Sequence, residues 1–407
     1  MNYLQNLKIG FKRSWRSPGA FINWGQEIGA RKRIMAGAAK ALNVGLSPFI
    51  PHGIQLEIFQ KSQIMPPNPT AERKQVAKDF FIAFLNREAR EFVKQMMIKS
   101  YTEAIMIHHP QAEKLNWGSI QAKCEILINT IFRRLEDIQP KPEYLFEILK
   151  SMGRLTRDNQ ETDLWFIEYQ EAYNYYKHNT KLLKRDLLLF PHIVGNSLVD
   201  IGCGGGDQVA YTMKNHPDIT EAAGIDILDW KTDGLKIDYH TLDFTKPGTC
   251  SPKMYDTGML LAVLHHAGRT NQEIKTFLTG VKTAVGKRLI VEEDVMITTQ
   301  DFSNRCLREK GLNTIEEKKT EQKLLAAYLG HSPETQRDIT SIADLLANSL
   351  SVGVPEMAFP FGFRSIGNWV KIFAKNGFEL NHLVILGFQP GNFNQQCHVI
   401  FILDRMR

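Results

Sequence analysis

Hydrophobic positions recur at two different spacings along the chain, and the change comes near Ser197. From Ala71 to about His109, apolar residues recur every three or four positions with Lys, Arg and Glu between them, as in amphipathic helices. Trp117–Ile138 continues this spacing, and Asp163–Leu189 is an aromatic-rich stretch of the same kind. The pattern therefore predicts that the first half of the chain is helical.

After Ser197, short β-branched or apolar runs alternate with helical runs, which is typical of an α/β fold. Strands are predicted at about 197–201, 222–226, 236–242, 255–263, 287–293, 379–388 and 397–403, and helices near 207–215, 270–284 and 365–376. A long polar stretch at 300–360 interrupts this alternation, and since such connections are usually short, it is predicted to be an inserted helical lid. The chain then divides into an all-α domain at 1–195 and an α/β domain at 196–407.

Charge is uneven along the chain. The formal net charge is +6, and residues 1–50 alone carry eight Lys or Arg and a single Glu. This segment is interpreted as a solvated basic face, as a surface for an acidic partner, or as a cleaved targeting peptide. The five scattered cysteines form no metal-type spacing and indicate a reducing, cytoplasmic location. No apolar run approaches the about 18–20 residues of a membrane span.

The sharpest chemical signal lies at residues 198–206, where the apolar run Leu-Val-Asp-Ile enters Gly-Cys-Gly-Gly-Gly before a predicted helix. Glycine lets the backbone approach a ligand, and a helix N-terminus presents free N–H groups. A dinucleotide fingerprint would need a third glycine at position 207, where Asp207 stands instead. A carboxylate there would repel a pyrophosphate, so a cofactor with a cationic head fits better.

Asp200-x-Gly202-x-Gly204-x-Gly206 resembles the first motif of class I S-adenosylmethionine-dependent methyltransferases. The resemblance implies that Asp200 and the turn, including Cys203, hold the methionine part of the cofactor. It covers residues 197–407 and implies a Rossmann-like, seven-stranded, mostly parallel sheet whose last strand is antiparallel.

The ends of the next two predicted strands agree with this resemblance. Asp226 comes 20 residues after the glycine turn, where a carboxylate can accept bonds from ribose hydroxyls, and Ile227 would flank the adenine. Asp243 resembles the acid that bonds the adenine amino group, with Phe244 beside the ring. A carboxylate that caps a turn is the other interpretation of Asp243. Only Thr245–Met254 precedes the next strand, so the helix usual there is short or missing.

Histidines and acids are expected together at the carboxyl edge of the sheet, where open α/β sheets bind ligands. The predicted fourth strand leads into Leu264, His265 and His266, and the fifth ends in Glu292-Glu293-Asp294. In the family the fourth strand ends beside the transferable methyl group, which makes Leu264 a cofactor contact. His266 aligns better than its neighbour with the histidine of related small-molecule enzymes.

Adjacent carboxylates repel one another unless water, a proton or a cation relieves them. Either Glu293 orients a histidine base, which makes His266, His265 and Glu293 the catalytic residues, or His265, His266, Glu293 and Asp294 bind a divalent metal. A solvated strand end is the third interpretation. The metal-free version is favoured because the sequence shows no compact ligand spacing.

The resemblance implies methyl transfer from S-adenosylmethionine to an O, N or C atom of a small or medium organic substrate, in secondary metabolism. The substrate would be free or carrier-bound, Arg364 is a candidate anchor for its carboxylate or phosphate, and the helical domain would cover the cleft or form a homodimer. One rival is a nucleic-acid methyltransferase, which the basic N-terminus favours but the missing Asp/Asn-Pro-Pro-Tyr-type motif disfavours. The other rival is a cofactor-binding protein without catalysis.

Overall fold

The computed structural model describes residues 70–149, 167–178, 184–229, 231–312, 319–349, 361–389, 391–393 and 395–406. All of them belong to one compact unit, Pro69–Arg407. The basic segment at 1–50, and residues 313–318 and 350–360 of the predicted lid, lie outside the described residues. Within the described residues, no helix is long and apolar enough to cross a membrane.

Helices make up the described part of the chain before the sheet. They are α4 (Ala71–Leu85), α5 (Arg87–His108), η1 (Ala112–Lys114), α6 (Trp117–Ile138), η2 (Pro142–Tyr144), α8 (Ile167–His178), α9 (Lys184–Leu189) and η3 (Phe190–His192). The single helix expected at 71–109 is two helices, because Asn86 ends α4 in an extended conformation and its side chain caps Ala89 N at the start of α5. A separate all-α domain at 1–195 stays a prediction.

An eight-stranded sheet forms the rest of the core, in the order β3-β2-β1-β4-β5-β8-β7, with β6 paired to β5 off this path. The strands are β1 (Ser197–Ile201), β2 (Glu221–Asp226), β3 (Asp238–Thr241), β4 (Tyr255–Leu261), β5 (Val285–Met296), β6 (Arg364–Ser365), β7 (Phe378–Gly387) and β8 (His398–Arg405). Strands β1 to β5 pair in parallel, whereas β8 is antiparallel to both β5 and β7. The predicted α/β class, the mostly parallel sheet and the antiparallel last strand are confirmed; the two-residue β6 was not predicted.

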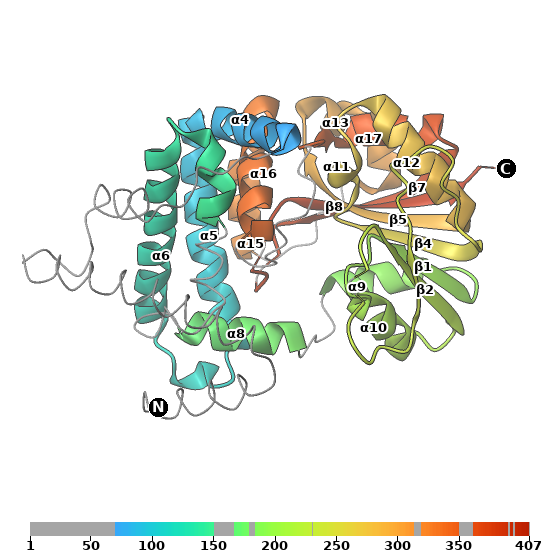
Figure 1. Cartoon of the computed structure of the whole chain (residues 1–407), viewed down its shortest axis with the longest axis horizontal. Helices are drawn as coiled ribbons and strands as arrows, with labels where there is room; N and C mark the ends of the chain where they lie inside the picture. Colours follow the sequence, from blue (N-terminus) through green and yellow to red (C-terminus); the bar gives the residue numbers. More distant parts are fainter. Residues whose placement is uncertain are drawn as a thin grey trace, which may run out of the picture. The chain divides into compact units, whose positions relative to one another are not determined.

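Helices cover both faces of this sheet (Figure 1): α10 (Asp207–Asn215) lies on one face, and α12 (Asn271–Ala284) and α17 (Ile366–Lys375) lie on the other. The central strands are almost fully buried, as strands covered on both faces must be. The α10 face is lined by apolar residues of six strands and two helices, among them Leu198, Val209, Met259, Ile290 and Ile400. The carboxyl ends of β1, β2, β4 and β5 therefore come to one edge on a rigid support.

The predicted lid is helical where the structure describes it. It contains α13 (Thr299–Ser303), α14 (Arg305–Leu307), the π-helical turn η4 (Arg308–Leu312), α15 (Lys319–Leu329) and α16 (Pro333–Ala347). Helix α16 packs on α4, α5 and β5. The Gln336 side chain exchanges two hydrogen bonds with Ile297, of 2.8 and 3.0 Å, and Tyr328 Oη donates to Val295 O at 2.8 Å. Helices α15 and α16 are thus fixed to the end of β5, and closure over a substrate stays a prediction.

Candidate functional site

The glycine turn between β1 and α10 has three residues in the left-handed region. Gly202, Gly204 and Gly206 have φ angles of 78°, 55° and 85°, a conformation that costs other residues energy. A Cβ at Gly202 would lie 2.5 Å from Val263 Cγ2, and one at Gly206 would lie 2.3 Å from Ile237 Cδ1. A Cβ at Gly204 would meet no non-neighbouring atom of the described chain within 4 Å. The turn is therefore packed at both ends and open at Gly204, where a ligand can approach the backbone.

Asp226, at the end of β2, holds this turn in place. Its Oδ2 accepts a hydrogen bond from Gly204 N at 2.8 Å, and its Oδ1 accepts one from Leu228 N at 3.2 Å. Asp226 is buried, as is Asp200 on the neighbouring strand. Burial, together with these two carboxylates, raises the pKa of the Cys203 thiol, which therefore stays neutral. Two buried acids beside an open turn fit a cofactor with a cationic head, and the ribose contact of Asp226 stays a prediction.

The residues after β2 and β3 lie in different surroundings. Ile227 is exposed, whereas Phe244 is buried with its ring centroid 6.3 Å from that of Phe277 on α12. The Asp243 carboxylate accepts from Thr245 N at 3.0 Å and lies 3.3 Å from Lys246 Nζ, which is a turn-capping arrangement. The adenine contacts proposed for Ile227, Asp243 and Phe244 stay predictions.

A strained turn leads from β4 into α11 (Leu264–Ala267). Ala262 has a φ of 57°, which is unfavourable for a residue with a Cβ and persists only where its surroundings enforce it. Its N–H donates to Glu292 O at 2.9 Å, and Leu264 N donates to Glu293 Oε2 at 2.8 Å. These bonds to β5 hold the first turn of α11 against the neighbouring strand.

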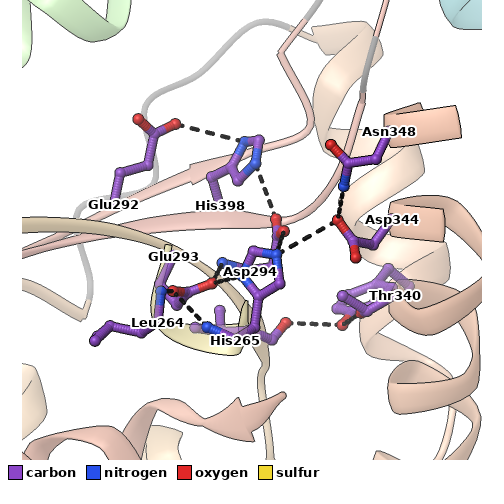
Figure 2. A network of polar contacts seen from close by, with 11 residues as sticks. Leu264, His265, Glu292, Glu293, Asp294, Thr340, Asp344, Asn348 and His398 are labelled. Carbon is purple, nitrogen blue, oxygen red and sulfur yellow. Dashed lines mark hydrogen bonds and ion pairs between the residues drawn. The ribbon is translucent and has the colours of Figure 1, made fainter. Parts of the chain in front are cut away.

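Figure 2 shows a network of buried polar side chains at this edge. We call it the His265 cluster; its members are His265, Glu292, Glu293, Asp294, Asp344 and His398. His265 Nδ1 bonds Glu293 Oε1, so Nδ1 carries the proton when Glu293 is ionised. On the other side of the ring, Nε2 lies 3.4 Å from Asp344 Oδ1 and 3.9 Å from Asp294 Oδ2. The Nε2 contact with Asp344 is an ion pair when the imidazole is protonated.

Burial and neighbouring charges oppose each other in this cluster. Burial disfavours a charged His265, but Glu293 and Asp344 outweigh it and raise the pKa of the imidazole well above its usual value. Burial also raises the pKa of Asp294, and His398 and His265 only partly offset it. At Asp344 the balance is reversed, because His265 and His266 outweigh burial and lower the pKa of that carboxyl.

The structure brings together His265, Glu293 and Asp294 and adds two members that sequence reasoning missed. Asp344 comes from α16, where it stands among buried apolar residues such as Ile342 and Leu345, and a lone acid in an apolar run was the available signal. His398 begins β8, and its Nε2 lies 2.9 Å from Asp294 Oδ1. Nothing in the spacing of the sequence joins these two residues to the others.

His266 differs from His265 in exposure. The two rings lie 4.0 Å apart between centroids, but His265 is 1% exposed and stacks on Phe363, whereas His266 is only half-buried. Of the two histidines, His266 is therefore the more exposed.

Arg364, the predicted substrate anchor, is engaged with the backbone. Its guanidinium donates to Gly362 O and Arg269 O and lies over the Trp369 ring, 4.8 Å from the centroid. It also lines a groove of about 480 Å³ together with residues of α12 and α17. Its role in binding a substrate stays a prediction.

No protein-family model matches the sequence, and no curated protein is similar to it in sequence. Among solved structures, the chain is similar to an S-adenosylmethionine-dependent methyltransferase from Methanosarcina mazei, at 14% identity over 54% of this chain and 97% of that one, with a TM-score of 0.33. For the mitomycin 7-O-methyltransferase MmcR, the identity is 12%, the coverage is 70% of each chain and the TM-score is 0.34. For the magnesium protoporphyrin IX methyltransferase ChlM from Synechocystis PCC 6803, the identity is 14% over 65% of this chain and 94% of that one, with a TM-score of 0.32.

Proposed function

We propose that this chain is a class I S-adenosylmethionine-dependent methyltransferase that acts on a small or medium organic substrate. The glycine turn is the observation that carries the proposal. A buried strand enters three left-handed glycines, a helix follows, and the backbone at Gly204 is open. Two buried carboxylates, Asp200 and Asp226, suit the cationic amino-acid head and the ribose hydroxyls of the cofactor.

In this proposal, residues of the chain orient the two reactants and accept the proton. S-adenosylmethionine would supply the electrophilic methyl group, and the carboxyl edge of the sheet would hold it and the acceptor in line. His266 is the proposed proton acceptor, because it is half-buried and lies in α11, which follows the carboxyl end of β4. His265 and Glu293 are buried and bonded to each other, so in this proposal they position His266 and do not touch the substrate.

Binding of S-adenosylhomocysteine tests the cofactor site. Calorimetry should give a micromolar dissociation constant, which corresponds to about −8 kcal/mol. Gly204→Ala should weaken binding about tenfold or more, because it places a methyl group where the ligand approaches. Gly248→Ala is the matched control, since Gly248 also has a positive φ and open space around its Cα. Equal affinity in both variants would contradict the site, and a wild-type protein that does not bind S-adenosylhomocysteine would contradict the function.

The same proposal includes a role in secondary metabolism, a cytoplasmic location and a homodimer formed through the helical part of the chain. Transfer of a radiolabelled methyl group to a small-molecule extract, compared with transfer to RNA and DNA, separates the proposed substrate class from nucleic acid. Salt-sensitive binding and methylation of RNA or DNA would favour the rival class.

A further inference from the structure

We infer that the groove between α12 and α17 binds a phosphate-bearing small molecule. Of the nine residues that line its volume of about 480 Å³, four are cationic, four carry a side-chain amide, one is apolar and none is acidic. The cations are Lys275, Arg364, Lys371 and Lys375. This inference concerns a site separate from the glycine turn and does not depend on methyl transfer.

The spacing of polar residues along the two helices brings them to the groove. Asn368, Lys371 and Lys375 stand three and four positions apart on α17, so they form one stripe along that helix. Asn271 and Lys275 are one turn apart on α12 and line the same groove. Other positions of both helices are apolar and buried. The groove is therefore the place where the polar sides of the two helices meet.

The positive charges of the groove have no counter-charge within the described part of the chain. Helix α17 contains no acidic residue, and the single acid of α12, Glu273, accepts from the N–H groups of Arg269 and Thr270 in the helix cap. None of the three lysines of the groove pairs with a carboxylate among the described residues. Lys371 and Lys375 are also like charges one turn apart, which repel each other. A bound anion would relieve this repulsion.

The state of Arg364 indicates which anion fits. Its guanidinium already donates to Gly362 O and Arg269 O, so it adds a fixed positive charge but is not free to bind a carboxylate with both arms. Binding therefore depends on the lysines, whose ammonium groups are compact charges with three rotatable donors each. The amides of Asn271 and Asn368 add further N–H donors. Many donors from several directions suit the several oxygens of a phosphate group.

The position and size of the groove separate its occupant from the cofactor. The glycine turn leads into α10, on the opposite face of the sheet from α12 and α17 (Figure 1). S-adenosylmethionine also carries no phosphate. A volume of about 480 Å³ lies in the range of small-molecule sites, and Ile372 is the single apolar residue that lines it. The groove therefore fits a second, polar and phosphorylated ligand.

Titration with pyrophosphate tests the groove. The full-length protein is titrated with sodium pyrophosphate, and separately with inorganic phosphate, by calorimetry at an ionic strength held constant with NaCl. One pyrophosphate should bind per chain. The double variant Lys371→Gln/Lys375→Gln should bind it about tenfold more weakly, because charge-assisted hydrogen bonds are lost. Lys371→Arg/Lys375→Arg keeps both charges and should retain most of the affinity.

Lys214→Gln is the matched control, because Lys214 is an exposed lysine on α10. It should bind pyrophosphate like the wild type, and near-ultraviolet circular dichroism should show all variants folded. The phosphate site is wrong if the wild type shows no binding at constant ionic strength, or if Lys371→Gln/Lys375→Gln binds like the wild type. A poly-glutamate peptide that binds more tightly than pyrophosphate through the same lysines would also overturn it, in favour of an acidic protein surface.

S-adenosylhomocysteine binding is measured in the same samples. It should be the same in the wild type and in every lysine variant, because the glycine turn is built from other residues. Failure of the phosphate site is therefore distinguishable from failure of the proposed function.

Discussion

The turn between β1 and α10 and the His265 cluster both place polar groups at the carboxyl edge of the sheet, but they are built in opposite ways. The turn comes from consecutive residues of one strand–helix connection, with Asp226 as its partner from the next strand. The cluster takes its members from β5, β8, α11 and α16, which are spread from His265 to His398. A site made of consecutive residues can be recognised from their spacing in the sequence. A site whose residues come from distant elements forms only when the chain folds.

The two regions also differ in what keeps them in place. Backbone conformation defines the turn, since glycine at positive φ is needed at 202, 204 and 206. Charge balance in a buried setting defines the cluster, since each carboxylate depends on an imidazole or a backbone N–H from another element. Mutations should therefore have large, cooperative effects in the cluster and smaller, local effects around the turn.

The largest effect is expected for His265→Ala. Its removal leaves buried carboxylates on both sides without their shared partner, and breaking a buried pair in this way costs about 3–5 kcal/mol. Denaturant unfolding should show this loss in the free energy of unfolding. His240→Ala is the control, because His240 forms a surface pair with Asp238 (3.1 Å), worth about 0–1 kcal/mol. Similar losses of unfolding free energy in the two variants would mean that the buried cluster contributes no more to stability than this surface pair.

The next effect is expected for Asp226→Asn. An amide has one acceptor oxygen and cannot take both bonds that the carboxylate accepts, from Gly204 N and Leu228 N. We expect S-adenosylhomocysteine binding, measured by calorimetry, to weaken by about 1–3 kcal/mol. Asp218→Asn, an exposed acid before β2, should bind like the wild type. An unchanged affinity in Asp226→Asn would mean that the turn does not need this carboxylate to hold the cofactor.

A third effect concerns strain in the turn itself. Gly202→Ala should lower the free energy of unfolding by about 2 kcal/mol, because the new Cβ is strained at this φ and meets Val263 Cγ2 at 2.5 Å. In Gly248→Ala the new Cβ is also strained at a positive φ but overlaps no other atom, so the free energy of unfolding should fall by only about 1 kcal/mol. The difference between the two measures packing alone. No difference would show that Val263 moves aside and that the turn is less tightly packed than its geometry indicates.

The smallest effect tests purely local structure. Thr270 caps α12: its Oγ1 accepts from Glu273 N at 3.2 Å, while Glu273 Oε2 accepts from Thr270 N at 2.8 Å. Thr270→Ala should cost about 1 kcal/mol in thermal or denaturant unfolding. Thr279→Ala, at an exposed position inside the same helix, should leave the stability unchanged or raise it slightly. If both variants lose the same stability, the cap contributes nothing of its own.

The spacing of hydrophobic residues along the chain was sufficient to predict most of the strands and helices. Strand β1 and helices α6 and α10 were predicted with their observed bounds. A short apolar run is typical of a strand covered on both faces, and apolar residues three or four positions apart are typical of a helix with one buried face. Predictions at helix ends were weaker. A single helix was expected at 71–109, yet Asn86 divides it, since its amide also bonds Asp338 of α16 at 2.8 Å, a contact 252 residues away in the chain.

The sequence by itself determined the α/β class and the glycine turn, because each depends on residues close together in the chain. The antiparallel last strand was predicted only through the resemblance to the methyltransferase family, because its pairing joins distant segments. It also placed His265, Glu293 and Asp294 at one edge, since neighbouring parallel strands end there. Only the tertiary structure decided that His265 is buried and His266 half-exposed, and that Asp344 and His398 join the cluster. The physical reason is that a helix inserted after β5 and a strand paired antiparallel to β5 bring their side chains there through long-range packing, which no spacing in the sequence records.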